Sequence, residues 1–263
     1  MSDAAHPILI ATGAAMTEIS YQLYSSRNFP PLSETLSMLK GLGYSQVEGY
    51  GGLYGDPAGL AAALREAGLA MPSGHFSLDM LEKEPDKAMA VIKAVGMRAV
   101  YCPHIGPDLR PTDAAGWRAF GRRLQQAGAP FRAAGLTFGW HNHDFEFRVQ
   151  RDGAVPMAEI LAGGPELSWE ADIAWIVRGG ADPFDWIARH GERISAAHVK
   201  DIAPPGQCLD EDGWADVGHG TIDWTGIWRA LKATACRFFI MEHDKPNDHR
   251  RFAARSIESV RTF

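Results

Sequence analysis

The chain has 263 residues, of which 46% are hydrophobic and 22% charged, and these are the proportions of an ordinary globular protein. Its formal net charge of −6, with no basic stripe, argues against broad electrostatic binding of nucleic acid. The three cysteines, Cys102, Cys208 and Cys236, form no CxxC pair, so the sequence predicts buried, unreactive thiols rather than a zinc ribbon or a disulfide framework.

The N-terminal segment 1–17 is apolar around 7–13, but it lacks the basic residues that open a signal peptide, and Asp3 is acidic. We therefore expect an N-terminal extension over 1–16 and a cytoplasmic protein. No apolar run reaches the length of a membrane span, so we expect no membrane association.

From residue 18 onward, segments with the hydrophobic spacing of strands alternate with segments that have the spacing of helices. In chain order the expected elements are strand 18–23, helix 32–42, strand 46–48, helix 57–67, strand 69–76, helix 85–95, strand 98–102, helix 113–134, strand 136–143, helix 156–162, strand 167–172, helix 183–190, strand 194–199, helix 224–233, strand 237–242 and helix 248–260. Four of these helices stop at a glycine, the usual C-terminal cap: Gly43, Gly68, Gly96 and Gly135.

Strict alternation of strand and helix indicates a parallel sheet, because consecutive parallel strands need a helical crossover. Eight such units in about 250 residues are what a closed barrel requires. A doubly wound open sheet usually has a glycine-rich loop after its first strand, whereas residues 24–28 contain no glycine. The sequence therefore predicts an α/β protein with a single (β/α)8 TIM-barrel domain over 1–263.

Polar side chains stand at the C-terminal ends of nearly all the expected strands. In chain order they are Gln22 and Tyr24, Glu48, His75, His104, His141 with His143, Asp172, His198 and Glu242. In a barrel these ends and the loops after them build the active site. Buried strand ends would otherwise carry mostly apolar residues, so this convergence predicts a site at the C-terminal mouth. Glu48, His75 and His104 are candidates for contacting a substrate there.

The run from Trp140 to Phe147 places two imidazoles at one strand end. On an extended strand His141 and His143 point to the same face. Such a pair is typical of a metal site or a proton-transfer site, and the alternative is a polar strand end at the surface.

Asp172, His198 and Glu242 each end a short hydrophobic run. Carboxylates with an imidazole, and no nearby thiolate, suit a divalent ion such as manganese, cobalt, magnesium or zinc. Each residue alone has an ordinary explanation; an aspartate before a helix, for example, is usually an N-cap. Together the three predict a metal centre with positions open to substrate oxygens.

Other residues leave alternatives open. Glu170 points the same way as Asp172 one layer deeper, as a supporting residue or a competing ligand. Lys200 is a candidate for holding an oxyanion and equally a surface lysine. Trp175 is a candidate for lining a sugar face, and His219 is a weaker site candidate. The other candidates for lining a sugar face are Phe76, Trp140, Phe145 and Trp169. Of these four and Trp175, we expect no more than two to contact a substrate.

The chain resembles the xylose-isomerase-like barrels, the sugar phosphate isomerase/epimerase superfamily. The segments that carry the resemblance are Tyr21–Ser25, Gly43–Glu48, His141–Phe147, Asp172–Trp175 with Gly180–Pro183, His198–Asp201, Val217–Trp224 and Glu242–Asp244. The resemblance implies a divalent metal at the ends of strands five to eight, held here by His141, Asp172, His198 and Glu242.

This chain differs from the ketose epimerases of the family at the first of those ligands, where they carry a glutamate that also acts as an acid/base. A metal-bound His141 has no free base on that side, which argues against the two-carboxylate mechanism of those epimerases. Glu146 or Glu170 is an alternative ligand to His141. Histidine-rich runs at this strand occur in members that resemble inosose dehydratase.

The leading hypothesis is a metal-dependent isomerase or epimerase that removes the proton α to the carbonyl of a keto-sugar or cyclitol. Glu242 or His143 is the expected base, and Lys200 is expected to steady an oxyanion. The alternative is a dehydratase or lyase of the inosose-dehydratase type that acts on a keto-sugar, keto-glycoside or cyclitol, and a non-catalytic sugar-binding barrel is a remote one. A metal-dependent hydrolase of the abasic-site endonuclease type shares the fold, but the net charge of −6 argues against it. A small sugar or cyclitol is thus the expected partner, and a homo-oligomer is left open.

Overall fold

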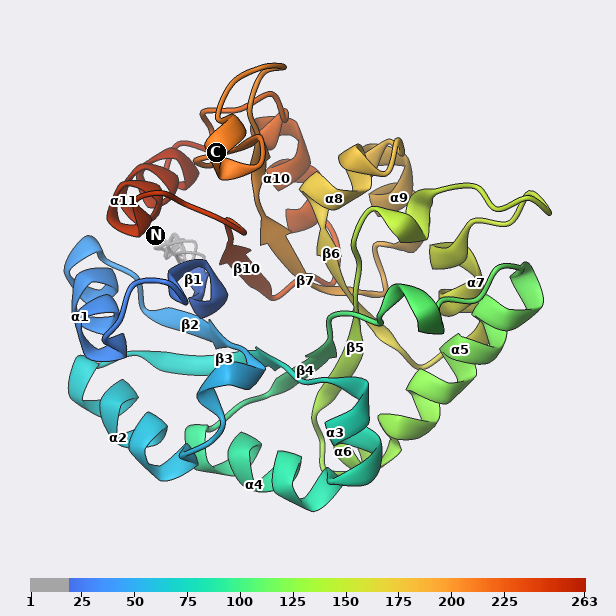
Figure 1. The fold of residues 1–263 in the computed structure, drawn as a ribbon, viewed down its shortest axis with the longest axis horizontal. Coiled ribbons are helices and arrows are strands. Elements are labelled where there is room, and N and C mark those ends of the chain that lie inside the picture. Colours follow the sequence, from blue (N-terminus) through green and yellow to red (C-terminus); the bar gives the residue numbers. More distant parts are fainter. Residues whose placement is uncertain (1–18) are drawn as a thin grey trace, which may run out of the picture.

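A computed structural model describes residues 19–263 and shows a closed barrel of parallel strands (Figure 1). The barrel strands are β1 (Ile19–Gln22), β2 (Gln46–Gly49), β3 (Ala70–His75), β4 (Ala99–Cys102), β5 (Thr137–His141), β6 (Ser168–Asp172), β7 (Ile194–Val199) and β10 (Phe238–Met241). Each pairs in parallel with its neighbours, and β1 closes the ring by pairing with both β2 and β10. The predicted barrel is confirmed, whereas the expected extension over 1–16 lies outside the described residues.

Helices surround this ring in chain order (Figure 1). They are α1 (Leu32–Leu42), α2 (Pro57–Ala67), α3 (Leu78–Lys83), α4 (Pro85–Val95), α5 (Ala114–Ala127), α6 (Ala129–Ala133), α7 (Pro156–Gly163), α8 (Ile173–Arg178), α9 (Pro183–His190), α10 (Trp224–Lys232) and α11 (His249–Val260). Gly43, Gly68 and Gly96 end their helices in the left-handed conformation, as their positions predict.

The expected helix 113–134 is wrong in its length, because it is divided into α5 and α6 at Gly128. Pro130 has no N–H with which to continue the ladder of α5, and it instead occupies the first turn of α6. A Cβ at position 128 would also collide with the ring of Phe138 on β5. The short helices α3 and α8 were not predicted, since six residues give little periodicity.

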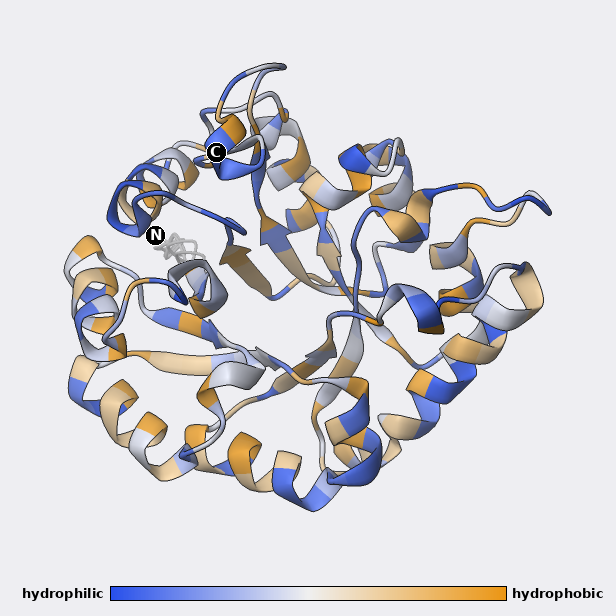
Figure 2. Cartoon of the chain, in the orientation of Figure 1, coloured by the Kyte–Doolittle hydropathy of each residue, from blue (hydrophilic) through white to orange (hydrophobic). Residues whose placement is uncertain are grey.

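The hydrophobic core fills the space between the strands and the inward faces of the helices. Each long helix alternates hydrophilic and hydrophobic residues along its ribbon, and the hydrophobic ones pack on the barrel (Figure 2). Trp117, Trp140 and Trp169 are among the fully buried side chains. Among residues 19–263, no helix has the length and apolarity needed to cross a membrane.

A small hairpin stands between β7 and α10, where the sequence predicted only a loop. Its strands β8 (Asp201–Ile202) and β9 (Trp214–Ala215) pair antiparallel. Arg251 on α11 donates hydrogen bonds to Glu211 at 2.7 Å and to Asp216 at 3.1 Å, which anchors the hairpin to the barrel wall. This anchoring fixes Trp214 beside the mouth of the barrel.

Candidate active site

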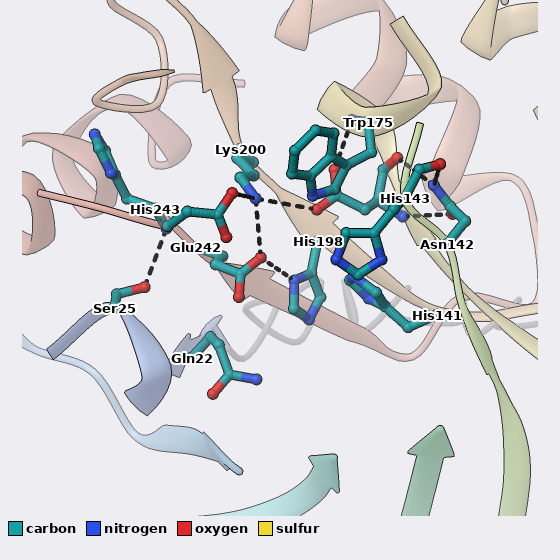
Figure 3. Close-up of polar contacts among 12 residues, drawn as sticks. Gln22, Ser25, His141, Asn142, His143, Trp175, His198, Lys200, Glu242 and His243 are labelled. Carbon is teal, nitrogen blue, oxygen red and sulfur yellow. Dashed lines mark hydrogen bonds and ion pairs between the residues drawn. The ribbon is translucent and has the colours of Figure 1, made fainter. Parts of the chain in front are cut away.

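Four of the predicted ligands meet at the C-terminal mouth of the barrel. His141 ends β5, Asp172 ends β6, His198 lies near the end of β7, and Glu242 follows β10. One ligand atom from each lies within 4.8 Å of the others, and all four residues are buried. Figure 3 shows His141, His198 and Glu242 of this group side by side. Four neighbouring strands of one barrel therefore deliver two imidazoles and two carboxylates to one point.

A second group of possible ligands overlaps the first and consists of His75, His141, Glu170 and His198. Glu170 accepts hydrogen bonds from His75 at 2.6 Å and from His141 at 3.1 Å. It lies two residues before Asp172 on β6, so it is one layer deeper, as its position predicts. Two imidazoles engage its Oε2 atom, while its Oε1 atom has no hydrogen-bond partner among residues 19–263, so both groups are candidate metal sites.

Asp172 combines the two interpretations that its sequence position allows. Its Oδ1 atom accepts the backbone N–H of Trp175 at 2.9 Å and caps helix α8, which is the ordinary role of an aspartate before a helix. Its Oδ2 atom is buried and has no hydrogen-bond partner among the described residues. One carboxylate thus holds a helix and still offers an oxygen to the site.

His198 lies between two carboxylates. Its Nδ1 atom is 2.9 Å from Oε2 of Glu242, and its Nε2 atom is 2.8 Å from Oε1 of Glu48. Burial opposes protonation of this ring, but Glu242 and Glu170 outweigh burial and raise the pKa of His198. Burial likewise opposes ionisation of Glu242, but Lys200 and His198 outweigh it and hold the pKa of that carboxyl well below its ordinary value.

The donors present fit a divalent metal ion. Within residues 19–263, three buried carboxylate oxygens have no hydrogen-bond partner: Oε2 of Glu48, Oε1 of Glu170 and Oδ2 of Asp172. Such oxygens are costly unless they have a cation or proton to bind. A set of two imidazole nitrogens and two carboxylate oxygens suits manganese, cobalt or zinc, and magnesium less well. The metal identity stays a prediction.

Lys200 is not a surface lysine, because its side chain is completely buried. Its amine donates to Asp244 at 2.6 Å and to Glu242 at 3.3 Å, and it lies 3.6 Å from Oδ2 of Asp172 (Figure 3). The rings of Trp175 and Trp214 cover it, with their centroids 4.9 and 4.2 Å from the amine. Lys200 therefore connects two of the predicted metal ligands electrostatically.

A cavity of about 730 Å³ opens above this cluster. The predicted site residues that line it are His75, His104, His141, His143, Trp175 and Glu242. Glu48 and Lys200 are buried beneath it and are not among the lining residues. Glu48 is instead held by Gln22 and His198, each at 2.8 Å, which places it as a support for His198.

The pattern of the xylose isomerase-like TIM barrel family matches residues 36–263. The chain belongs to this family. Its predicted membership is confirmed.

Three relatives of this xylose isomerase-like barrel are informative. The rhizopine catabolism protein MocC of Rhizobium meliloti is 26% identical over an alignment 194 residues long, which covers 65% of this chain and 58% of that relative. The chain thus spans little more than half of the length of this curated relative.

Two solved structures share the fold over almost the whole chain. A sugar phosphate isomerase/epimerase from Parabacteroides distasonis has a TM-score of 0.78 and 18% identity, with 95% of each chain covered. A probable 3-DHS dehydratase from Bacillus anthracis has a TM-score of 0.74 and 13% identity, with 93% of this chain and 99% of that chain covered. At these identities the likeness establishes the fold.

Some expected site residues of this family member lie elsewhere. His219 is exposed and does not line the cavity. Of the aromatic residues considered for a sugar face only Trp175 lines it, while Trp140, Trp169 and Phe76 are packed in the core. Cys102 and Cys236 are buried as predicted, whereas Cys208 is half-buried in a loop.

Sequence reasoning gave no role to Asn142, which locks two ligand-bearing strands of this xylose isomerase-like barrel together. Its Oδ1 atom accepts the indole N–H of Trp169 at 2.8 Å and the backbone N–H of Asp172 at 3.0 Å, and its amide donates to the Asp172 carbonyl at 3.1 Å. Glu146 adds a second clamp by accepting the backbone N–H of His143 at 2.9 Å and the indole N–H of Trp140 at 2.9 Å. The feature of the sequence that could have indicated this role is the position of Asn142 between two histidines at a strand end.

We expect Asn142→Ala to lower the free energy of unfolding by about 2–4 kcal/mol, because two buried N–H donors, on Trp169 and Asp172, lose the side-chain oxygen that accepts them. The midpoint of urea denaturation measures this. Asn28→Ala, at an exposed asparagine, should leave the midpoint nearly unchanged. An equal midpoint for Asn142→Ala and the unmodified protein would contradict the clamp.

Proposed function

We propose that this family member is a divalent-metal-dependent enzyme that isomerises or epimerises a keto-sugar or cyclitol by removing the proton α to its carbonyl. The observation that carries the proposal is the meeting of His141, Asp172, His198 and Glu242 beneath an open cavity. The epimerase name of the Parabacteroides distasonis structure is consistent with it.

His141, Asp172, His198 and Glu242 would hold the metal. When bound, the ion supplies a Lewis acid toward the carbonyl and the neighbouring hydroxyl of the substrate. Lys200 keeps Glu242 ionised and oriented through its contact at 3.3 Å. His75, His104 and Trp175 are proposed to contact the substrate, since all three line the cavity.

His143 is the proposed proton-transfer residue. Its ring lines the cavity, and its buried Nδ1 atom has no hydrogen-bond partner among residues 19–263. Burial, with Lys200 acting in the same direction, lowers the pKa of His143 to about 3, so the ring is neutral at pH 7. Glu242 is the other candidate base, but its Oε2 atom is already engaged by His198 and Lys200.

The test is to incubate manganese-loaded protein in D2O with a panel of keto-sugars and inososes. NMR then measures the exchange of substrate C–H for deuterium. We expect exchange α to the carbonyl of at least one compound, and a fall of about 100-fold or more in His143→Ala, as for loss of a general base. Glu192→Ala, at an exposed carboxylate, is the control. Sugar binding without any exchange would leave a non-catalytic barrel as the better description.

A dehydratase or lyase is the second candidate, because one observation favours it. The Nδ1 atom of His141 contacts Glu170 at 3.1 Å, so a ring that also held a metal through Nε2 would have no free base. A two-base epimerisation then lacks its second carboxylate at this strand. The dehydratase name of the Bacillus anthracis structure is in line with this alternative, and loss of water from the substrate in the same NMR experiment would identify it.

A further inference from the structure

The cavity is larger than a single sugar ring needs. Liquid water takes about 30 Å³ per non-hydrogen atom, so a hexose of about 12 such atoms fills at most roughly 360 Å³. About half of the 730 Å³ cavity then remains beyond a hexose placed at the metal ligands. The remaining volume is large enough for a second chemical group on the ligand.

The extra space extends toward strands that bear none of the proposed metal ligands. Those ligands come from β5, β6, β7 and the end of β10, whereas Tyr24 and Arg27 follow β1, and Tyr50, Gly51 and Gly52 follow β2. In the closed barrel β1 and β2 are separated from β5 and β6 on both sides by other strands. β1 is the neighbour of β10, after which Glu242 lies, so a ligand held at the metal ligands can extend past Glu242 to the β1–β2 side.

The cavity wall on the β1–β2 side consists of two tyrosine rings that lie beside glycine backbone. The rings of Tyr24 and Tyr50 meet edge to face with their centroids 5.4 Å apart, and both line the cavity. Tyr50 lies against the backbone of Gly52, where a Cβ would come within 2.6 Å of its ring. At Gly51, by contrast, a Cβ would meet no atom within 4 Å, so the space beside this wall is open.

The two cations on this side of the cavity differ in their partners. Lys245 pairs with Asp212 at 3.0 Å, and the guanidinium of Arg27 lies 3.8 Å over the Tyr24 ring. Burial raises the pKa of Asp244, and Arg27 is among the cations that oppose this rise. The aromatic rings and the Lys245–Asp212 pair suit a neutral, hydroxyl-bearing or aromatic group, while Arg27 makes a phosphate the alternative against which that group is tested.

We propose that the Tyr24–Tyr50 wall, with Gly51 and Gly52, is a subsite for the second ring of a glycoside, either its aglycone or a second sugar. The inference rests on the proposed function, because it places the reacting ring at the metal ligands. The substrate class is then a keto-glycoside rather than a free keto-sugar or a sugar phosphate.

The probes are 4-nitrophenyl glucosides and galactosides of both anomeric forms, compared with glucose, galactose and glucose 6-phosphate. Calorimetric titration of manganese-loaded protein should show at least one glycoside bound about tenfold more tightly than its parent sugar. Gly51→Leu, which fills the open space, and Tyr50→Ala should each abolish that tenfold preference and change the affinity for the free sugar less than twofold. Gly55→Leu is the matched control, since a Cβ there also meets no atom within 4 Å and Gly55 does not line the cavity.

Equal affinities for the glycosides and their parent sugars, or no binding of any glycoside, would overturn the proposal. Tighter binding of glucose 6-phosphate than of every glycoside would overturn it in favour of a phosphate subsite. These titrations need no turnover, so their outcome is separate from that of the deuterium-exchange test. Exchange on free keto-sugars without a glycoside preference would leave the proposed function standing and remove only the subsite.

Discussion

Asp172→Asn should reduce the affinity of the protein for Mn²⁺ by at least about 100-fold, because partners that merely orient metal ligands already contribute 10- to 100-fold. Asparagine keeps an oxygen that can accept the Trp175 N–H and cap α8, so the fold should be retained while the anionic ligand is lost. Metal content after gel filtration, measured by mass spectrometry, reports the result without any assumption about the reaction. His198→Ala and Glu242→Ala should behave in the same way.

Glu170→Gln is the control that distinguishes the two overlapping groups of possible ligands. Glu170 is buried and belongs only to the deeper group, whereas Asp172 belongs only to the group at the strand ends. Retention of manganese by Glu170→Gln and its loss from Asp172→Asn would place the ion at the strand ends. The opposite pattern would place it one layer deeper, and unchanged metal content in all four variants would exclude both sites.

The strand-end residues were predictable because a parallel barrel turns chain order into a spatial ring. His141, Asp172, His198 and Glu242 are far apart in the sequence, yet each ends or follows a hydrophobic run of strand length. Once the alternation of strands and helices predicts a barrel, the C-terminal ends must meet at one mouth. No contact had to be known in advance, only the period of the hydrophobic pattern.

The supporting contacts were not predictable in the same way, because they depend on side-chain directions within the assembled mouth. Lys200 has the sequence position of a mouth residue, but Trp175 and Trp214 cover it, and Trp214 stands on a hairpin too short to have a pattern. Its partner Asp244 lies in an irregular segment after β10. His143 also lies two residues beyond the end of β5, so its approach to His141 depends on the turn held by Glu146.

Lys200→Met should destabilise the metal-free protein by about 3–5 kcal/mol, the usual cost of removing one partner of a buried ion pair. The amine lies within 3.6 Å of carboxylate oxygens on Asp172, Glu242 and Asp244, and methionine supplies no charge to balance them. In a domain of this size the melting temperature should fall by roughly 10 °C. Manganese should recover part of the loss, because an ion held by Asp172 and Glu242 neutralises two of the three carboxylates.

Lys245→Met is the matched control for that change. Lys245 is another lysine at the mouth, and it forms an ion pair with Asp212 in which the two side chains are 48% and 57% exposed. Loss of this exposed ion pair should change the free energy of unfolding by less than about 1 kcal/mol. The double variant Lys200→Met/Asp244→Asn should be more stable than Lys200→Met alone, because it removes the carboxylate nearest to the missing amine. A Lys200→Met protein as stable as Lys245→Met, with or without manganese, would show that Lys200 does not balance the ligand charges, and its role would return to the oxyanion contact expected from the sequence.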